Sequence, residues 1–289
     1  MNRCLLLLFA SWIGAADLVV APCAAAEPKV TKDVAYAEPA TVRRTLDVYS
    51  PPEGEKHPVV VWIHGGGWKR GDKSSVQRKP QAFVDRGFVF VSINYRFVPE
   101  VTIQQMTGDV AKAIRWVREH AKEYGGDGES IFVMGHSAGA HLAALVGTDE
   151  RYLKAEGLSL AALKGCVPVD VSMYDAAPQI KWLEENAPVR AQLFTSTFGD
   201  EASRIELSPI KYVAEGKSIP PFLILCCANR PDASSQSAKF GAALEKAGVA
   251  ATVLAAEGKD HGSINSELGL PDDPPTVALD KFLNGILKR

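Results

Sequence analysis

One serine of the chain stands where a nucleophile is expected. Ser137 is at the centre of "GHSAG" (135–139), which fits the pattern G-x-S-x-G. The motif follows the apolar run "IFVM" (131–134) and precedes a helical pattern. This strand–turn–helix context is the one in which the motif marks a nucleophile. Small residues on both sides of the serine allow a sharp turn that exposes its Oγ. We therefore interpret Ser137 as a nucleophile, in preference to a glycine-rich turn that only packs against a helix.

A serine hydroxyl is a weak nucleophile and needs a base. The candidate base is His261, in "GKDHGSIN" (258–265), because this loop follows the last strand-like run of the chain. There it can reach the edge of a sheet that carries Ser137. The other histidines have more local interpretations, as packing, surface or loop residues: His57, His64, His120, His136 and His141.

An acidic side chain should orient His261 and stabilise its imidazolium form. The expected chain order is serine, then aspartate or glutamate, then histidine. Asp232 follows the apolar run 222–227 and is the preferred candidate. Asp170, at the end of the preceding run, and Asp260, beside the histidine, are the alternatives, and each could instead be an ordinary loop or cap residue.

A run of glycines could stabilise the charge that serine chemistry creates. Attack on a carbonyl builds negative charge on its oxygen, which preorganised backbone N–H groups stabilise. One donor is expected from Ala138, the residue after the nucleophile, and others from an HGGG-type loop after an earlier strand. "HGGGW" (64–68) is such a loop, and its glycines leave room for the charged oxygen. No Gly-Lys-Ser/Thr follows, which excludes a P-loop.

Short apolar runs that alternate with helical patterns must position these residues. Runs that are apolar on both faces suit a sheet covered on both sides. Such alternation predicts an α/β fold with a doubly wound, mostly parallel central sheet. "TLDVYSPP" (45–52) is expected at the edge of that sheet and residues 27–40 as a loose lead-in. The strand-like runs are 58–63, 88–93, 131–134, 163–169, 222–227 and 251–256, and the helical patterns are 77–86, 103–124, 138–146, 235–247 and 277–287.

One interval is longer than a plain crossover needs. About fifty residues, 171–219, separate two strand-like runs. We interpret them as a small helical cap over the carboxyl edge of the sheet, within a single domain that spans 27–289. Aromatic residues in the cap, with Trp68 after the glycines, weakly favour a pocket for a small or aromatic substrate, although such residues more often form a core: Trp182, Phe194 and Phe198.

The first 26 residues have the layout of a secretory signal. Arg3 precedes an apolar run from Leu5, and three alanines end at Ala26. Asp17 interrupts the apolar run, which argues against a membrane anchor. We expect cleavage after Ala26 and export to the periplasm or the medium, so the exported protein should begin at Glu27. Amino-terminal sequencing of exported material tests this; full-length protein in the membrane fraction would contradict it.

Composition narrows the remaining function classes. The chain has 289 residues, a formal net charge of −2 and no basic stripe, so neither nucleic acid nor an anionic membrane is an expected partner. Three cysteines remain outside the leader, and two of them are adjacent in an apolar run. This number and spacing of cysteines fit neither a disulfide framework nor a zinc site. We expect no metal and no cofactor, and the sequence does not indicate an oligomeric state.

Three segments together resemble serine esterases of the α/β-hydrolase superfamily. "VVVWIHGGGWKRGDK" (59–73), "SINYRF" (92–97) and "GHSAGAHLAAL" (135–145) are similar to the hormone-sensitive-lipase-like group, and are closest to its bacterial feruloyl-esterase-like and arylformamidase-like carboxylesterases. The resemblance runs from Leu46 to His261. "ANRPDASSQ" (228–236) departs from the commoner acidic or glycine-containing form.

The resemblance implies a site and an activity. It implies an α/β-hydrolase fold, a triad of Ser137, Asp232 and His261, and hydrolysis of a small-molecule ester through an acyl-enzyme on Ser137. An amide such as an aryl formamide is the alternative substrate, because the same triad serves both. A non-catalytic binder is the third possibility, disfavoured since nucleophile, acid and base are all present. The implied oxyanion donors are the N–H groups of Gly66, Gly67 and Ala138.

Overall fold

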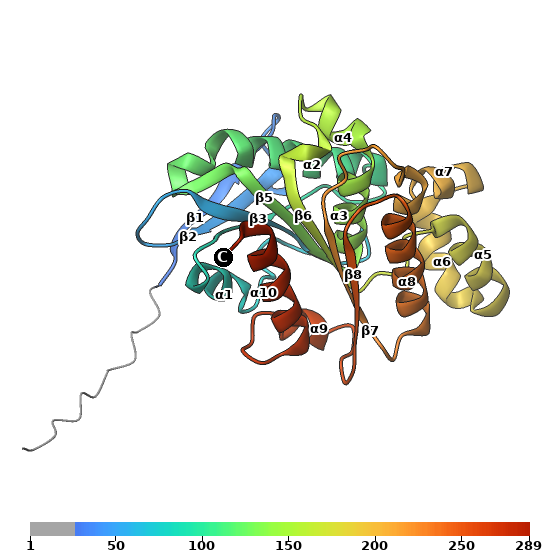
Figure 1. The fold of residues 1–289 in the computed structure, drawn as a ribbon. Coiled ribbons are helices and arrows are strands. Elements are labelled where there is room, and N and C mark those ends of the chain that lie inside the picture. Colours follow the sequence, from blue (N-terminus) through green and yellow to red (C-terminus); the bar gives the residue numbers. More distant parts are fainter. Residues whose placement is uncertain (1–26) are drawn as a thin grey trace, which may run out of the picture.

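A computed structural model describes residues 27–289 of the chain. The predicted leader, 1–26, lies outside the described residues. An eight-stranded sheet in the order β1-β2-β4-β3-β5-β6-β7-β8 forms the centre of the molecule (Figure 1). The strands are β1 (Lys29–Ala35), β2 (Thr45–Ser50), β3 (His57–Ile63), β4 (Val89–Ile93), β5 (Gly126–His136), β6 (Leu163–Val169), β7 (Phe222–Cys227) and β8 (Ala251–Ala256).

The predicted doubly wound, mostly parallel sheet is confirmed. β2 is antiparallel to β1 and β4, and the neighbours from β4 to β8 are parallel. The α-helices are α1 (Lys79–Asp85), α2 (Ile103–His120), α3 (Ala138–Thr148), α4 (Glu150–Ala155), α5 (Ala176–Asn186), α6 (Pro188–Phe198), α7 (Glu201–Glu206), α8 (Pro231–Lys246), α9 (Ser263–Ser266) and α10 (Pro274–Leu287).

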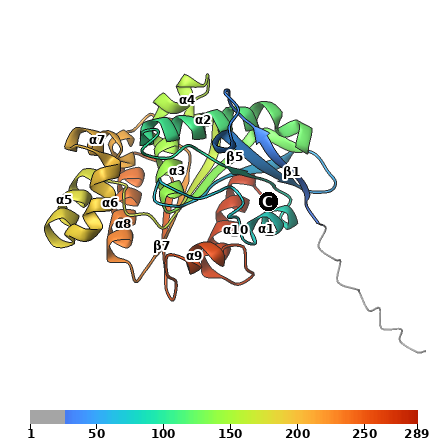
Figure 2. The ribbon, with the colours of Figure 1, turned by 180° about the vertical axis from the view of Figure 1, so that it is seen from behind.

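The two faces of the sheet bury two separate cores. Successive side chains of a strand point to opposite faces, so Val59 and Val61 join one core while Val60 and Trp62 join the other. Residues of α2, α3 and α8 complete the first core, and residues of α1 and α10 complete the second. The view from behind shows α1 and α10 together on their side of the sheet (Figure 2). Runs such as 58–63 are apolar on both faces because both faces are covered.

The amino-terminal part differs from the sequence prediction. Residues 29–35 form β1, which pairs with β2, so the expected lead-in is a strand and β2 is not at the edge. β1 is almost entirely exposed and carries the polar sequence KVTKDVA. Its side chains contribute little to the core, so its sequence has no alternation of apolar and polar residues. Hydrophobic periodicity therefore could not reveal this strand.

The long interval between β6 and β7 is helical. It contains α5, α6 and α7, followed by a short 3-10 turn (Pro209–Tyr212). These helices lie together beside α8 at one end of the sheet in both views (Figures 1 and 2). Among residues 27–289, no helix has both the length and the apolar character that a membrane crossing requires.

Candidate active site

Ser137 occupies a strained turn between β5 and α3. Its backbone has φ 56° and ψ −118°, a combination rare for a residue with a side chain. Its N–H donates to the carbonyl of Val169 over 2.9 Å, which holds the turn against the end of β6. A Cβ on Gly139 would lie 2.1 Å from the carbonyl oxygen of Ile63. The sequence can therefore make this turn only with glycine there, and the turn presents the serine hydroxyl at the carboxyl edge of the sheet.

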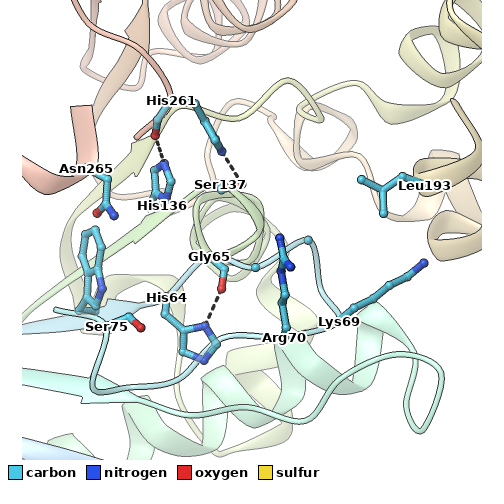
Figure 3. A pocket seen from close by; sticks show the side chains of 13 residues that line it. His64, Gly65, Lys69, Arg70, Ser75, His136, Ser137, Leu193, His261 and Asn265 are labelled. Carbon is cyan, nitrogen blue, oxygen red and sulfur yellow. Dashed lines mark hydrogen bonds between the residues drawn. The ribbon is translucent and has the colours of Figure 1, made fainter. Parts of the chain in front are cut away.

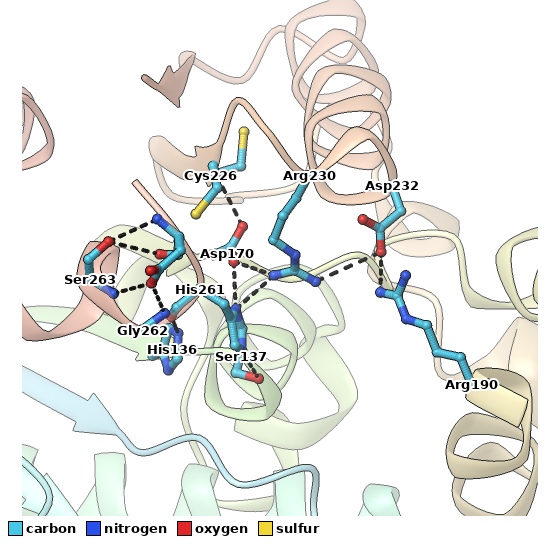
Figure 4. A network of polar contacts seen from close by, with 12 residues as sticks. His136, Ser137, Asp170, Arg190, Cys226, Arg230, Asp232, His261, Gly262 and Ser263 are labelled. Carbon is cyan, nitrogen blue, oxygen red and sulfur yellow. Dashed lines mark hydrogen bonds and ion pairs between the residues drawn. The ribbon is translucent and has the colours of Figure 1, made fainter. Parts of the chain in front are cut away.

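His261 lies in the loop after β8 and faces Ser137. Its Nε2 is 3.0 Å from Ser137 Oγ, and its Nδ1 is 2.6 Å from Oδ2 of Asp170 (Figure 4). The three side chains come from the carboxyl ends of three parallel strands, the edge where ligand sites of such sheets form. With its proton on Nδ1, the imidazole donates to the carboxylate and can accept the serine proton at Nε2.

Asp170 is built to remain ionised behind His261. Its side chain is fully buried, and its Oδ1 accepts the N–H of Cys227 over 3.1 Å. Arg230 donates to its Oδ2. Burial alone would raise the pKa of Asp170, but the hydrogen bond from His261 and the charge of Arg230 lower it to about 2. The carboxylate therefore stays charged at neutral pH.

The prediction that Asp232 orients His261 is wrong in this structure. Asp232 begins α8, and its Oδ2 accepts from Arg190 of α6 over 2.5 Å and lies 3.8 Å from Arg230 (Figure 4). The physical reason is that the turn after β7 directs an arginine, and not this carboxylate, towards the histidine. Of the two alternatives, Asp170 takes the position, while Asp260 accepts backbone N–H groups of its own turn.

Arg230 is a residue of the site that the sequence did not reveal. Its Nη1 contacts Asp170 Oδ2 and lies 2.7 Å from His261 Nδ1. Both nitrogens point at the same carboxylate oxygen, so we interpret their proximity as two donors that share one acceptor. No motif marks this arginine. The one signal in the sequence is that Arg230 lies two residues before Asp232, in the segment 228–236 that differs from the form common in the resembled family.

His136 supports His261 from the strand side. Its Nε2 is 2.8 Å from the backbone carbonyl of His261, and the two rings are 4.5 Å apart. Burial lowers the pKa of His136 to about 3, and the neighbouring His261 acts in the same direction. A neutral His136 with its proton on Nε2 donates to that carbonyl and holds the loop in place. Sequence reasoning had rejected His136 as a base, which this geometry supports, but had missed its supporting contact.

The glycine loop and the start of α3 border the same space. Gly65, Gly66 and Gly67 line the cavity with Ser137. In the part of the chain that the structure describes, the N–H groups of Gly66, Gly67 and Ala138 make no hydrogen bond. Free backbone donors beside a serine nucleophile can stabilise an oxyanion.

Gly66 has a structural requirement that the sequence argument did not foresee. Its φ is +130°, and a Cβ there would lie only 1.9 Å from the carbonyl oxygen of Arg70. Gly67 has φ +62°, and a Cβ there would have no atom within 4 Å. Space for a charged oxygen is therefore not the first reason for glycine at position 66, because the turn itself cannot close around a side chain.

Trp68 does not line the cavity, contrary to the weak prediction that it would. It is 3% exposed and packs edge-on against His141, Phe194 and Phe198. It therefore joins the glycine loop to α6 as a core residue. Trp182, which the sequence also suggested for a pocket, is 52% exposed. These positions give no structural support for an aromatic substrate.

His64 supports the loop from within. Its Nδ1 is 2.7 Å from the carbonyl of Gly65, and its ring stacks on Tyr95 at 4.5 Å. Burial lowers the pKa of His64 to about 4. Asp109, a buried residue of α2, accepts from Arg96 through both oxygens. Neither residue contacts Ser137.

The cavity above Ser137 has a volume of about 610 Å³, within the usual range for small-molecule sites. Figure 3 shows Ser137 between one group that includes Asn265 and Ser75 and another that includes Arg70, Lys69 and Leu193. No cluster of three or more His, Cys, Asp or Glu side chains able to hold a metal ion occurs within 27–289.

Comparison with protein families places this site in a known group. The model of the family described as BD-FAE matches residues 46–244, which include Ser137, Asp170 and Arg230 but not His261. Esterase LipQ of Mycobacterium tuberculosis is 35% identical over 248 residues, which cover 78% of this chain and 55% of LipQ. A probable isoprenylcysteine alpha-carbonyl methylesterase of Arabidopsis thaliana, ICMEL1, is 27% identical and covers 90% of this chain and 56% of its own. The chain thus spans a little over half the length of these curated relatives.

Solved structures show the same fold. The esterase Est2 of Thermogutta terrifontis superposes with a TM-score of 0.67 at 27% identity, covering 91% of this chain and 93% of its own. Esterase B of Lactobacillus rhamnosis superposes with a TM-score of 0.71 at 20% identity, covering 91% and 87%. At that identity the second likeness concerns the fold alone.

Proposed function

The chain belongs to the BD-FAE family, and from this premise and the geometry of its site we propose that it is a serine ester hydrolase. The observation that carries the proposal is the continuous contact from Ser137 through His261 to Asp170. The names of relatives that match most of this chain, among them an esterase and a probable methylesterase, support it.

The geometry suggests how the reaction would proceed. His261 Nε2 takes the proton of Ser137 while Oγ attacks the carbonyl carbon of the ester. The former carbonyl oxygen gains a negative charge, which the N–H groups of Gly66, Gly67 and Ala138 would stabilise. The tetrahedral intermediate collapses, the bond to the alcohol breaks, and His261 gives its proton to the departing oxygen. Asp170 stabilises the imidazolium throughout.

The acyl-enzyme is then released by the same groups. His261 removes a proton from a water molecule, which attacks the acyl carbon. The second tetrahedral intermediate uses the same three N–H groups. Its collapse breaks the bond to Ser137 Oγ, which recovers its proton from His261. The products are a carboxylic acid and an alcohol, and the enzyme returns to its starting state.

Replacement of the nucleophile tests the proposal. Ser137→Ala should lower hydrolysis of p-nitrophenyl butyrate by at least about a thousandfold, because the covalent route is lost. The variant should also fail to react with a fluorophosphonate probe that labels the wild type. Retention of turnover in a correctly folded Ser137→Ala protein, shown by an unchanged circular dichroism spectrum, would refute the mechanism.

A further inference from the structure

The cavity above Ser137 has an uneven distribution of charge. Lys69 and Arg70 line it, and no aspartate or glutamate is among its lining residues. The nearest carboxylate to the nucleophile, Asp170, is fully buried behind His261 and is paired with Arg230. The chain as a whole has a formal net charge of −2, so a positive cavity is a local property and not a reflection of overall charge.

Arg70 stands apart from the other arginines. Between residues 27 and 289 it alone has a guanidinium group without a hydrogen bond, an ion pair or a ring contact to another residue. Lys69 nearby has a single polar contact, to the hydroxyl of Ser196 over 3.2 Å. A guanidinium offers five N–H donors in a planar fork that matches a carboxylate. At Arg70 these donors are available to a ligand.

The backbone that carries these two cations is held against the glycine loop. The N–H groups of Lys69 and Arg70 both donate to the carbonyl of Gly66 over 3.2 Å. The carbonyl of Gly71 accepts from Arg43 over 2.9 Å. Because Lys69, Arg70 and the glycine loop form one hydrogen-bonded turn, the backbone from which the two cations extend has a fixed place beside the cavity.

The other side of the cavity is polar but neutral. Trp62, Ser75 and Asn265 line it, and the buried Nε1 of Trp62 and Oδ1 of Asn265 have no hydrogen-bond partner. Figure 3 shows Asn265 and Ser75 on the opposite side of Ser137 from Lys69. The lining residues on this side therefore offer no cation to a carboxylate, whereas Lys69 and Arg70 on the other side do.

We propose that the preferred substrates are esters that carry a free carboxylate, which Arg70 binds with help from Lys69. This inference rests on the proposed ester hydrolysis and adds a substrate class to it. Each substrate would place its ester carbonyl at Ser137 and its carboxylate at the guanidinium. An ion pair that is open to solvent typically strengthens binding by up to about fivefold.

Matched pairs of esters test the inference. The first pair is p-nitrophenyl hemisuccinate, with the carboxylate in the acyl part, and its neutral methyl-capped diester. The second pair is 4-acetoxybenzoic acid, with the carboxylate in the alcohol part, and its methyl ester. The measured quantity is the ratio of kcat/KM for the charged ester to that for its capped partner. Ser137→Ala protein serves as the blank, since hemisuccinates also hydrolyse without an enzyme.

Wild type should give a ratio of about two to five in one pair. Arg70→Gln should bring that ratio close to one, Arg70→Glu below one, and Arg70→Lys should retain part of the preference. Lys181→Gln removes a cation from an exposed position of α5 outside the cavity and should leave the ratio unchanged. Added salt should lower the wild-type ratio, because this charge is exposed.

Ratios near or below one for wild type in both pairs would overturn the inference, while turnover of the neutral esters would uphold the proposed function. The inference would also fail if the ratio were high but insensitive to Arg70→Gln and to the Lys69→Gln/Arg70→Gln double variant. A wild type that hydrolysed none of the four esters would overturn the proposed function, and the inference with it.

Discussion

The choice of acid is decided by side-chain direction at single residues. Asp170 has φ +53°, and its N–H donates to the carbonyl of Leu225 over 2.7 Å. This conformation turns its carboxylate under the loop that carries His261. Asp232 faces Arg190 of α6, where burial would raise the pKa of its carboxyl and the hydrogen bond from Arg190 lowers it. The two aspartates therefore have separate roles, one beside the base and one between the body of the fold and α6.

Exchange of each carboxylate for an amide tests this assignment. Asp170→Asn should lower kcat by about a thousandfold to ten-thousandfold, because an amide cannot hold His261 in the required tautomer. Asp232→Asn should lower it by less than about tenfold, because it only weakens an ion pair that is partly open to solvent. Steady-state kinetics with p-nitrophenyl butyrate measure both. An Asp232→Asn loss as large as that of Asp170→Asn would contradict the structural assignment.

At the scale of elements, the glycine loop combines two requirements. It must turn sharply after β3, and the proposed oxyanion site would need free N–H groups beside Ser137. Gly66 meets the first, because its missing Cβ allows the carbonyl of Arg70 to pack against it. Gly67 is open towards solvent or substrate and needs glycine chiefly for its positive φ. The loop then ends at Trp68, which the helices between β6 and β7 cover.

Alanine at each position should separate these requirements. Gly66→Ala should destabilise the fold by several kcal/mol and abolish esterase activity, because its Cβ would overlap the backbone of Arg70. Gly67→Ala should cost about 1 kcal/mol, the usual penalty for a left-handed residue, and lower Tm by about 2–4 °C. Thermal unfolding of both variants measures this difference. Equal losses of Tm would show that the close packing at Gly66 is not limiting.

At the scale of the whole molecule, a buried lysine connects α1 to α9, two helices far apart in the sequence. Lys79 of α1 is fully buried, and its Nζ donates to the carbonyl of Asn265 over 2.7 Å, in the helix just after His261. The Nζ also lies 4.5 Å from the ring of Trp62. Burial lowers the pKa of Lys79 to about 7, and the charge of Arg78 acts in the same direction. The Lys79 ammonium group therefore contributes both to the stability of the fold and to the position of the segment that follows His261.

Lys79 should make stability depend on pH. Its pKa is about 7 in the folded state and about 10.5 when the chain is unfolded, so between these values the unfolded state binds more protons. The free energy of unfolding should therefore rise with pH from about 7.5 to 9.5, by at most about 1.4 kcal/mol per pH unit from this group. Lys79→Met should lack that contribution.

Urea unfolding at pH 7.5, 8.5 and 9.5 checks this prediction. The difference in unfolding free energy between wild type and Lys79→Met should grow with pH in favour of wild type. Lys181→Met, at an exposed position of α5, is the matched control and should follow the wild-type curve. Parallel curves for wild type and Lys79→Met would show that Lys79 does not titrate in this range.

Much of the architecture could be predicted from local patterns. The runs at β3 to β7 are apolar on both faces because helices cover both, and the strand–turn–helix context indicated Ser137. β1 escaped prediction because it buries almost nothing, so no hydrophobic period marks it. The resemblance to a known family rests on short motifs, such as the one around Ser137. The backbone of each such motif is set mainly by residues next to one another in the sequence, so these motifs could be recognised without the structure.

Local sequence indicated Ser137 as the candidate nucleophile and determined its turn, while chain order indicated His261. Packing decided which carboxylate meets that histidine, that Arg230 joins it, and that Trp68 belongs to the core. The physical reason is that a turn depends on residues next to one another, whereas Asp170, Arg230 and His261 come from three strand ends far apart in the chain. Only the assembled sheet brings those ends together and sets the direction of each side chain.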